Sequence, residues 1–362
     1  MGYAADLCNQ ATQLFRQGQF RSAASLLEQG IVVARQEADS DNELLCYQKL
    51  TAALMNLDQS QQALELATTM LARARQLNEP HYELVATIRL CSALIDLDLK
   101  GRWPEIKALL LDCLHQAEAR NTSAWQLDCL RLLAGNAMTM QEYDDALSYA
   151  QQGLSIIRHD TYSADFYRYV FYRVLQRLHS QREEHADALR YGLLSFEYAQ
   201  REGNPAWVVL ARRYLAHLHY QQGNLQEAFN LFSENVATAL AYDCANDHQD
   251  ATMWRAEIAL QLEMGEQALE FAREALALAR QRLHARDEAW ALLANVRALY
   301  KLNRSDEAWY FANEAYHFAQ TQQLEHRLKE AREWIETLTK KQSAPTATNK
   351  QGSWFDRLIG KR

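Results

Sequence analysis

The chain has 362 residues, with 48% hydrophobic and 23% charged side chains, but only 4 prolines and 12 glycines, where average usage would give roughly 18 and 25. Because both residues mark turns and strand ends, their scarcity excludes folds with many turns, such as Rossmann domains, TIM barrels and β-sandwiches, and it predicts an all-helical protein. The net charge of −8 argues against nucleic acid as a partner.

A short pattern recurs along the chain: a small or polar residue is followed two positions later by an aromatic or apolar residue, and three positions after that by an alanine. Its clearest copies lie at 18–23, 141–146 and 223–228. With weaker copies included, the alanine of the pattern stands at Ala23, Ala63, Ala108, Ala146, Ala188, Ala228, Ala268 and Ala308. Successive alanines are 40, 45, 38, 42, 40, 40 and 40 residues apart. This spacing indicates eight repeats, each a pair of antiparallel helices with its turn just before the alanine.

The residues around these alanines explain how such helix pairs would pack. The small residue permits a tight turn, and the alanine lets the two helices approach closely. A large apolar residue followed by a small one stands about twelve positions earlier, as in Leu133-Ala134 and Leu215-Ala216. Another apolar or small residue stands four positions after the alanine, at Leu27, Ala67, Ala150, Phe232, Ala272 and Ala312. Two prolines fit the first turn of a helix, Pro104 in a second helix and Pro205 in a first helix.

These repeats resemble the tetratricopeptide repeat (TPR) family, over roughly residues 5–340. Their period of about 40 residues exceeds the 34 of the standard repeat and is similar to that of the helical-repeat regions of the activator MalT, the Rap-type peptide-sensing regulators and the kinesin light chains. The resemblance implies an all-α, right-handed superhelical solenoid of about eight helix hairpins plus a C-terminal capping helix. It also implies a concave groove, lined by the first helix of each hairpin.

Three segments complete the chain. Residues 325–341 predict a strongly charged capping helix with one apolar face, formed by Leu328, Ala331, Trp334, Ile335 and Leu338. Residues 342–352 are rich in Ser, Thr and Ala and predict a flexible linker. The predicted domains are therefore a solenoid with its cap at 1–341, a linker at 342–352 and a tail at 353–362.

The tail has the pattern of a short amphipathic helix with a basic back. Its predicted contact residues are Trp354, Phe355, Arg357, Leu358, Ile359, Lys361 and Arg362. Residues 340–362 carry six lysines or arginines and one aspartate, a net charge of +5, which leaves −13 for the rest of the chain.

The tail resembles the C-terminal membrane-targeting tails of the bacterial division proteins FtsA and MinD, although Asp356 makes it less basic. That resemblance implies binding to an anionic membrane surface. Two alternatives remain: the tail docks Trp354 and Phe355 into a second protein, or it folds back onto the capping helix.

The motifs of common catalytic and cofactor sites are absent from the sequence, including phosphate-binding loops, nucleophile elbows, Cys-x-x-Cys and His-Glu-x-x-His. Two clusters of potential metal ligands occur. They are His179, Glu183, Glu184 and His185, and Asp243, Cys244, Asp247, His248 and Asp250. We interpret the first cluster as a solvated turn and the second as helix capping. We therefore predict no enzyme activity, no cofactor and no bound metal.

A binding groove is the remaining candidate site. Counting back from the alanines places these residues on its surface: Arg131, Met138, Arg173, Arg177, Arg213, His217, Tyr220, Arg297 and Tyr300. Guanidinium groups bind carboxylates and aromatic rings cover apolar side chains, so the set fits an acidic peptide. The segment 162–172 adds six aromatic residues. The Lys and Asn clamp that some TPR proteins use for chaperone tails is not matched.

These observations favour a non-enzymatic scaffold or adaptor that binds a protein or peptide in its groove and tethers or docks itself through the tail. The alternative is a regulatory sensor of the MalT or Rap kind that binds a signalling peptide or small effector.

The six cysteines lack paired spacing, and no apolar run approaches the ~18–20 residues of a membrane span. We therefore expect reduced thiols and a cytoplasmic location, at the inner face of the membrane if the tail binds lipid.

Overall fold

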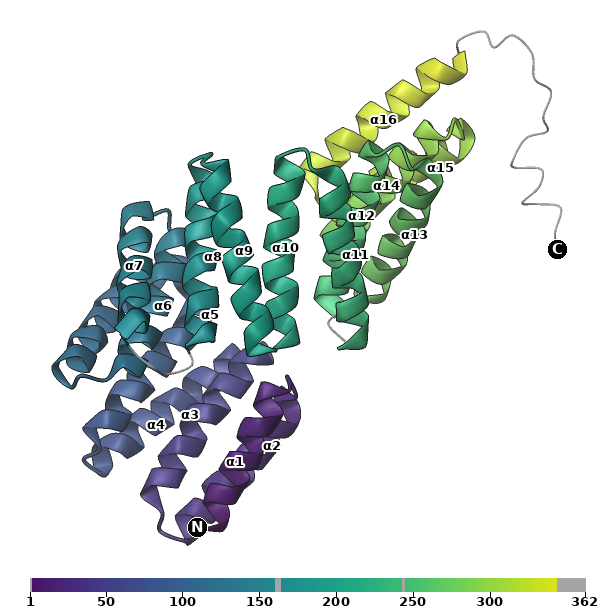
Figure 1. The fold of residues 1–362 in the computed structure, drawn as a ribbon. Coiled ribbons are helices and arrows are strands. Elements are labelled where there is room, and N and C mark those ends of the chain that lie inside the picture. Colours follow the sequence, from purple (N-terminus) through teal and green to yellow (C-terminus); the bar gives the residue numbers. More distant parts are fainter. Residues whose placement is uncertain (1, 160–163, 243–244, 344–362) are drawn as a thin grey trace. The chain divides into compact units, whose positions relative to one another are not determined.

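The computed structural model describes residues 2–159, 164–242 and 245–343, and within them it has sixteen helices and no strand (Figure 1). The helices are α1 (Tyr3–Arg16), α2 (Phe20–Gln36), α3 (Ser40–Asn56), α4 (Ser60–Gln76), α5 (Pro80–Ala119), α6 (Ser123–Thr139), α7 (Tyr143–His159), α8 (Asp165–Gln181), α9 (His185–Glu202), α10 (Pro205–Gln221), α11 (Leu225–Ala241), α12 (Ala245–Gln261), α13 (Gly265–Gln281), α14 (Ala285–Lys301), α15 (Ser305–Thr321) and α16 (Glu325–Ser343).

The helices form eight hairpins followed by one last helix, α16. One element, α5, consists of two helices joined at a kink, because Asp98 has non-helical backbone angles (φ −156°, ψ 67°). The remaining helices follow one another as antiparallel pairs along the chain (Figure 1). The predicted all-α, TPR-like architecture is confirmed.

The chain divides within α10 into two compact units, residues 1–211 and 212–362. Unit 1 contains α1 to α9 and the start of α10. Unit 2 contains the rest of α10 and the helices α11 to α16. In unit 1, buried side chains of α5 to α8 form one large apolar cluster, and those of α1 to α5 form a second.

The turn inside each regular hairpin places one residue in the left-handed region, five positions before the alanine of the repeat. These residues are Gly18, Asp58, Gln141, Glu183, Gly223, Glu263 and Asn303, with φ between 58° and 77°. Only two of them are glycines, the residue that adopts this conformation without steric cost. The turn geometry is therefore more regular than the turn sequence.

Seven of the eight predicted alanines are fully buried between the helices of their hairpins. They are Ala23, Ala63, Ala146, Ala188, Ala228, Ala268 and Ala308, each 0% exposed. The large and small residues predicted to pack with them are buried too, as Leu133 and Ala134 show. At Gly153 a Cβ atom would lie 2.2 Å from the ring of Phe171, so glycine is needed where α8 packs against α7.

The eighth alanine, Ala108, was assigned to the wrong register, because it is exposed to solvent. Ile106 takes the buried position, and Leu110 and Cys113 follow it at helical spacing. The kink explains the shift, since this hairpin has no separate turn and its second helix begins just after Asp98, whose Oδ1 accepts a hydrogen bond from the Gly101 N–H (3.1 Å). Pro104 consequently lies in the second turn of that helix rather than the first.

The five cysteines in the described part of the chain are core residues, as predicted. Cys8, Cys46, Cys91, Cys113 and Cys129 are free thiols and all are buried. None of the described helices combines the length and apolar character that a membrane span requires.

Candidate functional site

A groove in unit 1 is the candidate binding site. Its larger part has a volume of about 700 Å³ and is lined mainly by α3, α5, α6 and α8. A second part of about 620 Å³ lies between α1, α3 and the segment that joins α9 to α10. The two parts share Phe15, Ala52, Arg89, Glu202 and Trp207. Together they offer the volume typical of ligand sites.

First helices of the hairpins supply most of the lining, as the resemblance to TPR proteins implied. On α8, the lining residues Val170, Arg173 and Arg177 recur at helical spacing, so they form one stripe. On the opposite side of the same helix, Phe171 and Leu178 are fully buried in the core. Alternation between core and groove along one helix therefore positions the arginines.

The groove is basic although unit 1 belongs to an acidic chain. Six basic side chains line its two parts, Lys49, Arg89, Arg131, Arg173, Arg177 and Arg201, against three acidic ones, Asp96, Asp128 and Glu202. This excess of positive charge favours an anionic ligand.

Asp128 is the centre of a buried ion-pair network at the groove floor. Its carboxylate lies 3.0 Å from Arg89 and 3.3 Å from Arg131, and it accepts a hydrogen bond from the Tyr167 hydroxyl (3.2 Å). Burial alone would raise the pKa of Asp128, but the two guanidinium groups and the hydroxyl outweigh it and hold the pKa below its usual value. Asp128 therefore fixes Arg89 and Arg131 in place and neutralises part of their charge.

Arg173 and Arg177 differ from these arginines, because no acidic side chain among the described residues forms an ion pair with either of them. Arg173 donates a hydrogen bond to the Tyr169 hydroxyl (2.9 Å), and its guanidinium lies 5.2 Å from the centre of that ring. Both arginines are half-buried and lie one helical turn apart on α8. Their charges are thus available to a ligand.

An aromatic wall closes the groove next to these arginines. The ring of Phe166 lies 4.4 Å from that of Trp207, and Tyr169 stacks on Trp207 at 6.1 Å. The guanidinium of Arg131 lies 5.8 Å from the centre of the Phe166 ring. Such a wall can cover an apolar side chain of a peptide whose carboxylates bind the arginines.

Only part of this site was predicted from the sequence. Arg131, Arg173 and Arg177 line the groove, and so do three aromatic residues of the 162–172 segment, Phe166, Tyr167 and Tyr169. The placement of Met138 on the groove was wrong, because Met138 is 5% exposed and belongs to the core. Phe15, Lys49, Arg89 and Trp207 were missed.

The predicted groove residues of unit 2 are engaged with neighbouring helices. Arg213 lies 3.6 Å from Asp247 and 3.8 Å from Asp250, and Arg297 lies 3.1 Å from Glu257 and 3.4 Å from Glu330. These ion pairs join successive first helices of unit 2.

The other three candidates of unit 2 are aromatic or imidazole rings in contact with tryptophans. His217 and Tyr220 pack edge-on against Trp254, at 4.6 and 5.2 Å, and Tyr300 packs against Trp334 at 5.2 Å. Burial, assisted by the charge of Arg213, lowers the pKa of His217 to about 4. His217 is therefore neutral at pH 7.

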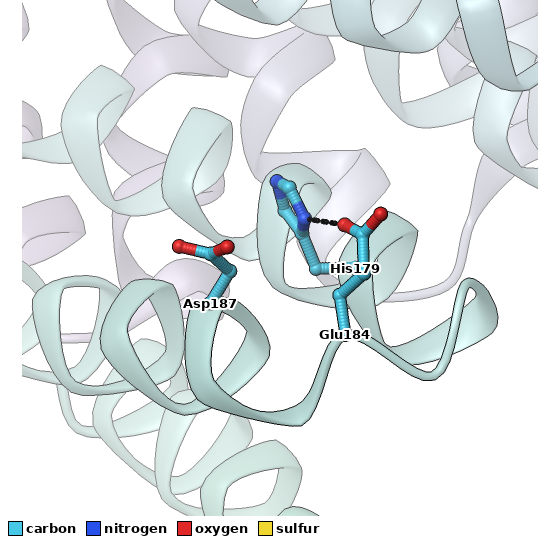
Figure 2. A group of neighbouring side chains, drawn as sticks. All are labelled: His179, Glu184 and Asp187. Carbon is cyan, nitrogen blue, oxygen red and sulfur yellow. Dashed lines mark hydrogen bonds and ion pairs between the residues drawn. The ribbon is translucent and has the colours of Figure 1, made fainter.

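The cluster near the turn between α8 and α9 brings one ligand atom each of His179, Glu184 and Asp187 within 4.8 Å of one another. Figure 2 shows the His179 imidazole turned toward the Glu184 carboxylate, to which Nδ1 is hydrogen-bonded. The imidazole also stacks on Tyr191 at 5.1 Å, and Asp187 lies 3.3 Å from Arg190. These partners account for all three side chains, and the Arg190 charge disfavours a cation, in keeping with a solvated turn.

The second cluster is also explained by contacts within the protein. Asp247 and Asp250 pair with Arg213, and His248 Nε2 lies 3.1 Å from Glu274. Residues 243 and 244 lie outside the described part of the chain, as do the tail residues 353–362.

No protein-family model matches the sequence, and no curated protein is significantly similar to it. Solved structures are similar at the level of the fold. A Signal Transduction ATPase with Numerous Domains that has a TPR sensor, from Pyrococcus horikoshii, has a TM-score of 0.63 and 14% identity over 91% of this chain. The match covers 50% of that protein, so this chain spans about half its length.

Two further solved structures are similar in fold. The apo form of the quorum sensor NprR from B. thuringiensis has a TM-score of 0.59 and 12% identity, over 87% of each chain. A Rap protein complexed with competence and sporulation factor has a TM-score of 0.56 and 13% identity, over 93% of this chain and 98% of its own. At these identities the likeness shows a shared helical-repeat fold.

Proposed function

We propose that the groove of unit 1 binds an acidic segment of a protein or peptide, and that the chain acts as a non-enzymatic adaptor. The observation that carries this proposal is the pair Arg173 and Arg177, which lie one turn apart beside an aromatic wall and have no acidic partner among the described residues. A guanidinium fork matches a carboxylate in geometry and charge.

The test compares two charge-reversed proteins. Arg173→Glu with Arg177→Glu should weaken the binding of short Asp- and Glu-rich peptides at least about a hundredfold, because two favourable charge contacts become repulsive. The control is Arg21→Glu with Arg102→Glu, which makes the same charge change at two unit 1 arginines outside the groove. Fluorescence anisotropy with labelled peptides and with their Asn- and Gln-substituted counterparts measures the effect. Equal affinities for the acidic and the neutral peptides would reject the proposal.

The alternative role is a regulatory sensor for a signalling peptide. It is supported by the fold shared with the Rap protein solved with competence and sporulation factor. A sensor changes conformation when its ligand binds, whereas an adaptor holds its partner on a preformed surface. Hydrogen exchange with and without bound peptide separates the two roles, since exchange changes confined to the groove favour the adaptor.

Tethering or partner docking through residues 353–362 stays a prediction. Cosedimentation of the full chain with vesicles of phosphatidylcholine and phosphatidylglycerol tests the membrane contact, and deletion of the ten residues is the control. The absence of enzymatic activity is likewise a prediction about the whole chain.

A further inference from the structure

The outer side of α15 carries an exposed tryptophan over a shallow hollow. Trp309 is 41% exposed, and with Asn313 and His317 it lines a depression of about 490 Å³ on this one helix. These three residues are spaced four apart, so they form a stripe along α15. Tyr310, which is 49% exposed, lines the same hollow beside Trp309, and adjacent exposed aromatic side chains of this size mark a contact surface.

The repeat shows what normally covers this stripe. In the preceding hairpins, the second helix of one hairpin contacts the second helix of the following hairpin. The ring of Phe229 on α11 lies 6.0 Å from that of Phe271 on α13. Arg273 on α13 lies 3.8 Å from Glu307 on α15. Phe229 directly follows the buried alanine of its repeat, Ala228, just as Trp309 follows Ala308. Trp309 therefore occupies the position that contacts the second helix of the following hairpin.

That following hairpin is incomplete in the described part of the chain. After α15 comes α16, which packs against α14 and α15 as the first helix of a ninth hairpin would. No described residue follows it as a second helix. The stripe of Trp309, Asn313 and His317 thus faces the place of a missing helix.

The described part of the chain ends close to the start of α15. Lys341, two residues before the end of α16, donates a hydrogen bond to the side chain of Asn303 (3.2 Å), and Asn303 lies two residues before the start of α15. The sequence continues for nineteen residues beyond Ser343. The nine residues of 344–352 extend to at most about 30 Å, whereas the whole of α15 is about 25 Å long. The tail can therefore reach every part of the stripe.

The apolar face of the tail complements the stripe on α15. The tail offers four large apolar residues, which share one face if it is helical, and the stripe offers the exposed ring of Trp309. Charge contributes less to this match, because Glu307 on α15 already pairs with Arg273 and Glu314 pairs with Arg280. The fit is therefore one of apolar surfaces.

We propose that residues 353–362 pack on the stripe of Trp309, Asn313 and His317, in the place of the second helix of a ninth hairpin. The contact is intramolecular and is independent of the groove in unit 1. It covers the apolar residues of the tail, so the tail is not free to bind a membrane while it is docked.

Hydrogen exchange of the full chain tests this contact. In the wild type, amides of 353–362 should exchange at least about tenfold more slowly than an unstructured chain, at every protein concentration. Trp309→Glu should remove this protection. Leu240→Glu is the matched control, because Leu240 is an exposed apolar residue of unit 2 outside the stripe (61% exposed), and it should leave the protection intact. Trp354→Glu, a change in the tail itself, should give the same loss without altering the helices.

Four results would overturn the proposal. Tail amides that exchange at the unstructured rate in the wild type show that nothing covers them. Protection that disappears on dilution assigns the contact to a second copy of the chain. Protection that persists in Trp309→Glu places the tail elsewhere. Protection that appears only with phosphatidylcholine and phosphatidylglycerol vesicles assigns the tail to the membrane.

Discussion

The first helices of the two units carry arginines at similar repeat positions, but the two units use them differently. In unit 2, Arg213 and Arg297 each lie within 4 Å of two carboxylates on neighbouring first helices. In unit 1, Arg89 and Arg131 share the single carboxylate of Asp128, and Arg173 and Arg177 have no acidic partner among the described residues. The same residue type therefore joins neighbouring helices in unit 2, whereas in unit 1 Arg173 and Arg177 have no acidic partner among the described residues and carry the proposed binding site.

This difference shows that an arginine on the inner face of a helical repeat is not by itself a sign of a binding site. What matters is whether the first helix of the neighbouring hairpin carries a carboxylate that forms an ion pair with the arginine. Asp247 and Asp250 neutralise Arg213, whereas the groove beside Arg173 offers aromatic rings instead. The proposed binding site in unit 1 therefore rests on the absence of acidic partners for Arg173 and Arg177 among the described residues rather than on the presence of arginines alone.

The largest expected effect comes from breaking the buried ion-pair network around Asp128 in unit 1. Asp128→Ala leaves Arg89, whose side chain is 14% exposed, without its counter-charge, and it should destabilise unit 1 by about 3 kcal/mol. The change in the unfolding free energy of unit 1 is measured by denaturant unfolding, with hydrogen exchange of buried amides in α5 and α6 as the probe. Asp112→Ala, at an exposed carboxylate of α5, should cost less than about 0.5 kcal/mol. Equal stabilities of the two variants would show that the ion pairs of Asp128 contribute nothing to the stability of unit 1.

A second effect, confined to unit 2, depends on pH. The pKa of His217 is about 4 in the folded chain against about 6.5 when unfolded. As the pH falls from about 6.5 to 4 the unfolded chain therefore takes up the proton first, and stability is lost over that range. His217→Gln should remove up to about 3 kcal/mol of this dependence.

The measurement is the unfolding free energy of unit 2 for both proteins between pH 4 and 7.5. Above about pH 7 the difference between them should be constant, because His217 is then neutral in both states. Parallel curves across the whole range would contradict the pKa and the burial that causes it.

Much of the fold was predictable because the same positions are buried in successive hairpins. Seven alanines marked the hairpins correctly, although only Gly18 and Gly223 are glycines at the left-handed turn position. The predicted register of the third hairpin was wrong because a larger residue, Ile106, takes the buried position of the alanine, and because a kink at Asp98 replaces the turn. A pattern read on alanine alone cannot detect such a replacement, whereas the apolar spacing of Trp103, Ile106 and Leu110 could have done so.

The candidate site was less predictable, because its properties arise from pairs of residues about one repeat apart. Arg89 and Asp128 are 39 positions apart, and Arg213 and Asp250 are 37 apart. Residue types at single positions reveal candidates, but only the packing of successive first helices shows which charges are already paired. Trp207 shows the same limit, since it lines the groove from the start of α10, about forty residues beyond Phe166 and Tyr169.

The smallest expected effects on stability come from replacing one inner-face arginine by alanine in each unit, and they compare the two units directly. Arg297→Ala removes two partly buried ion pairs and should destabilise unit 2 by about 1 kcal/mol without changing the affinity for acidic peptides. Arg177→Ala removes no ion pair and no side-chain hydrogen bond among the described residues, so it should change the stability of unit 1 by less than about 0.5 kcal/mol, yet it should weaken peptide binding about tenfold. The free energy of unfolding and the peptide affinity, measured on both variants, test this comparison. If Arg177→Ala also destabilised its unit, or if Arg297→Ala also weakened binding, the arginines of the two units would serve the same purpose and the distinction between a packed and an open inner face would fail.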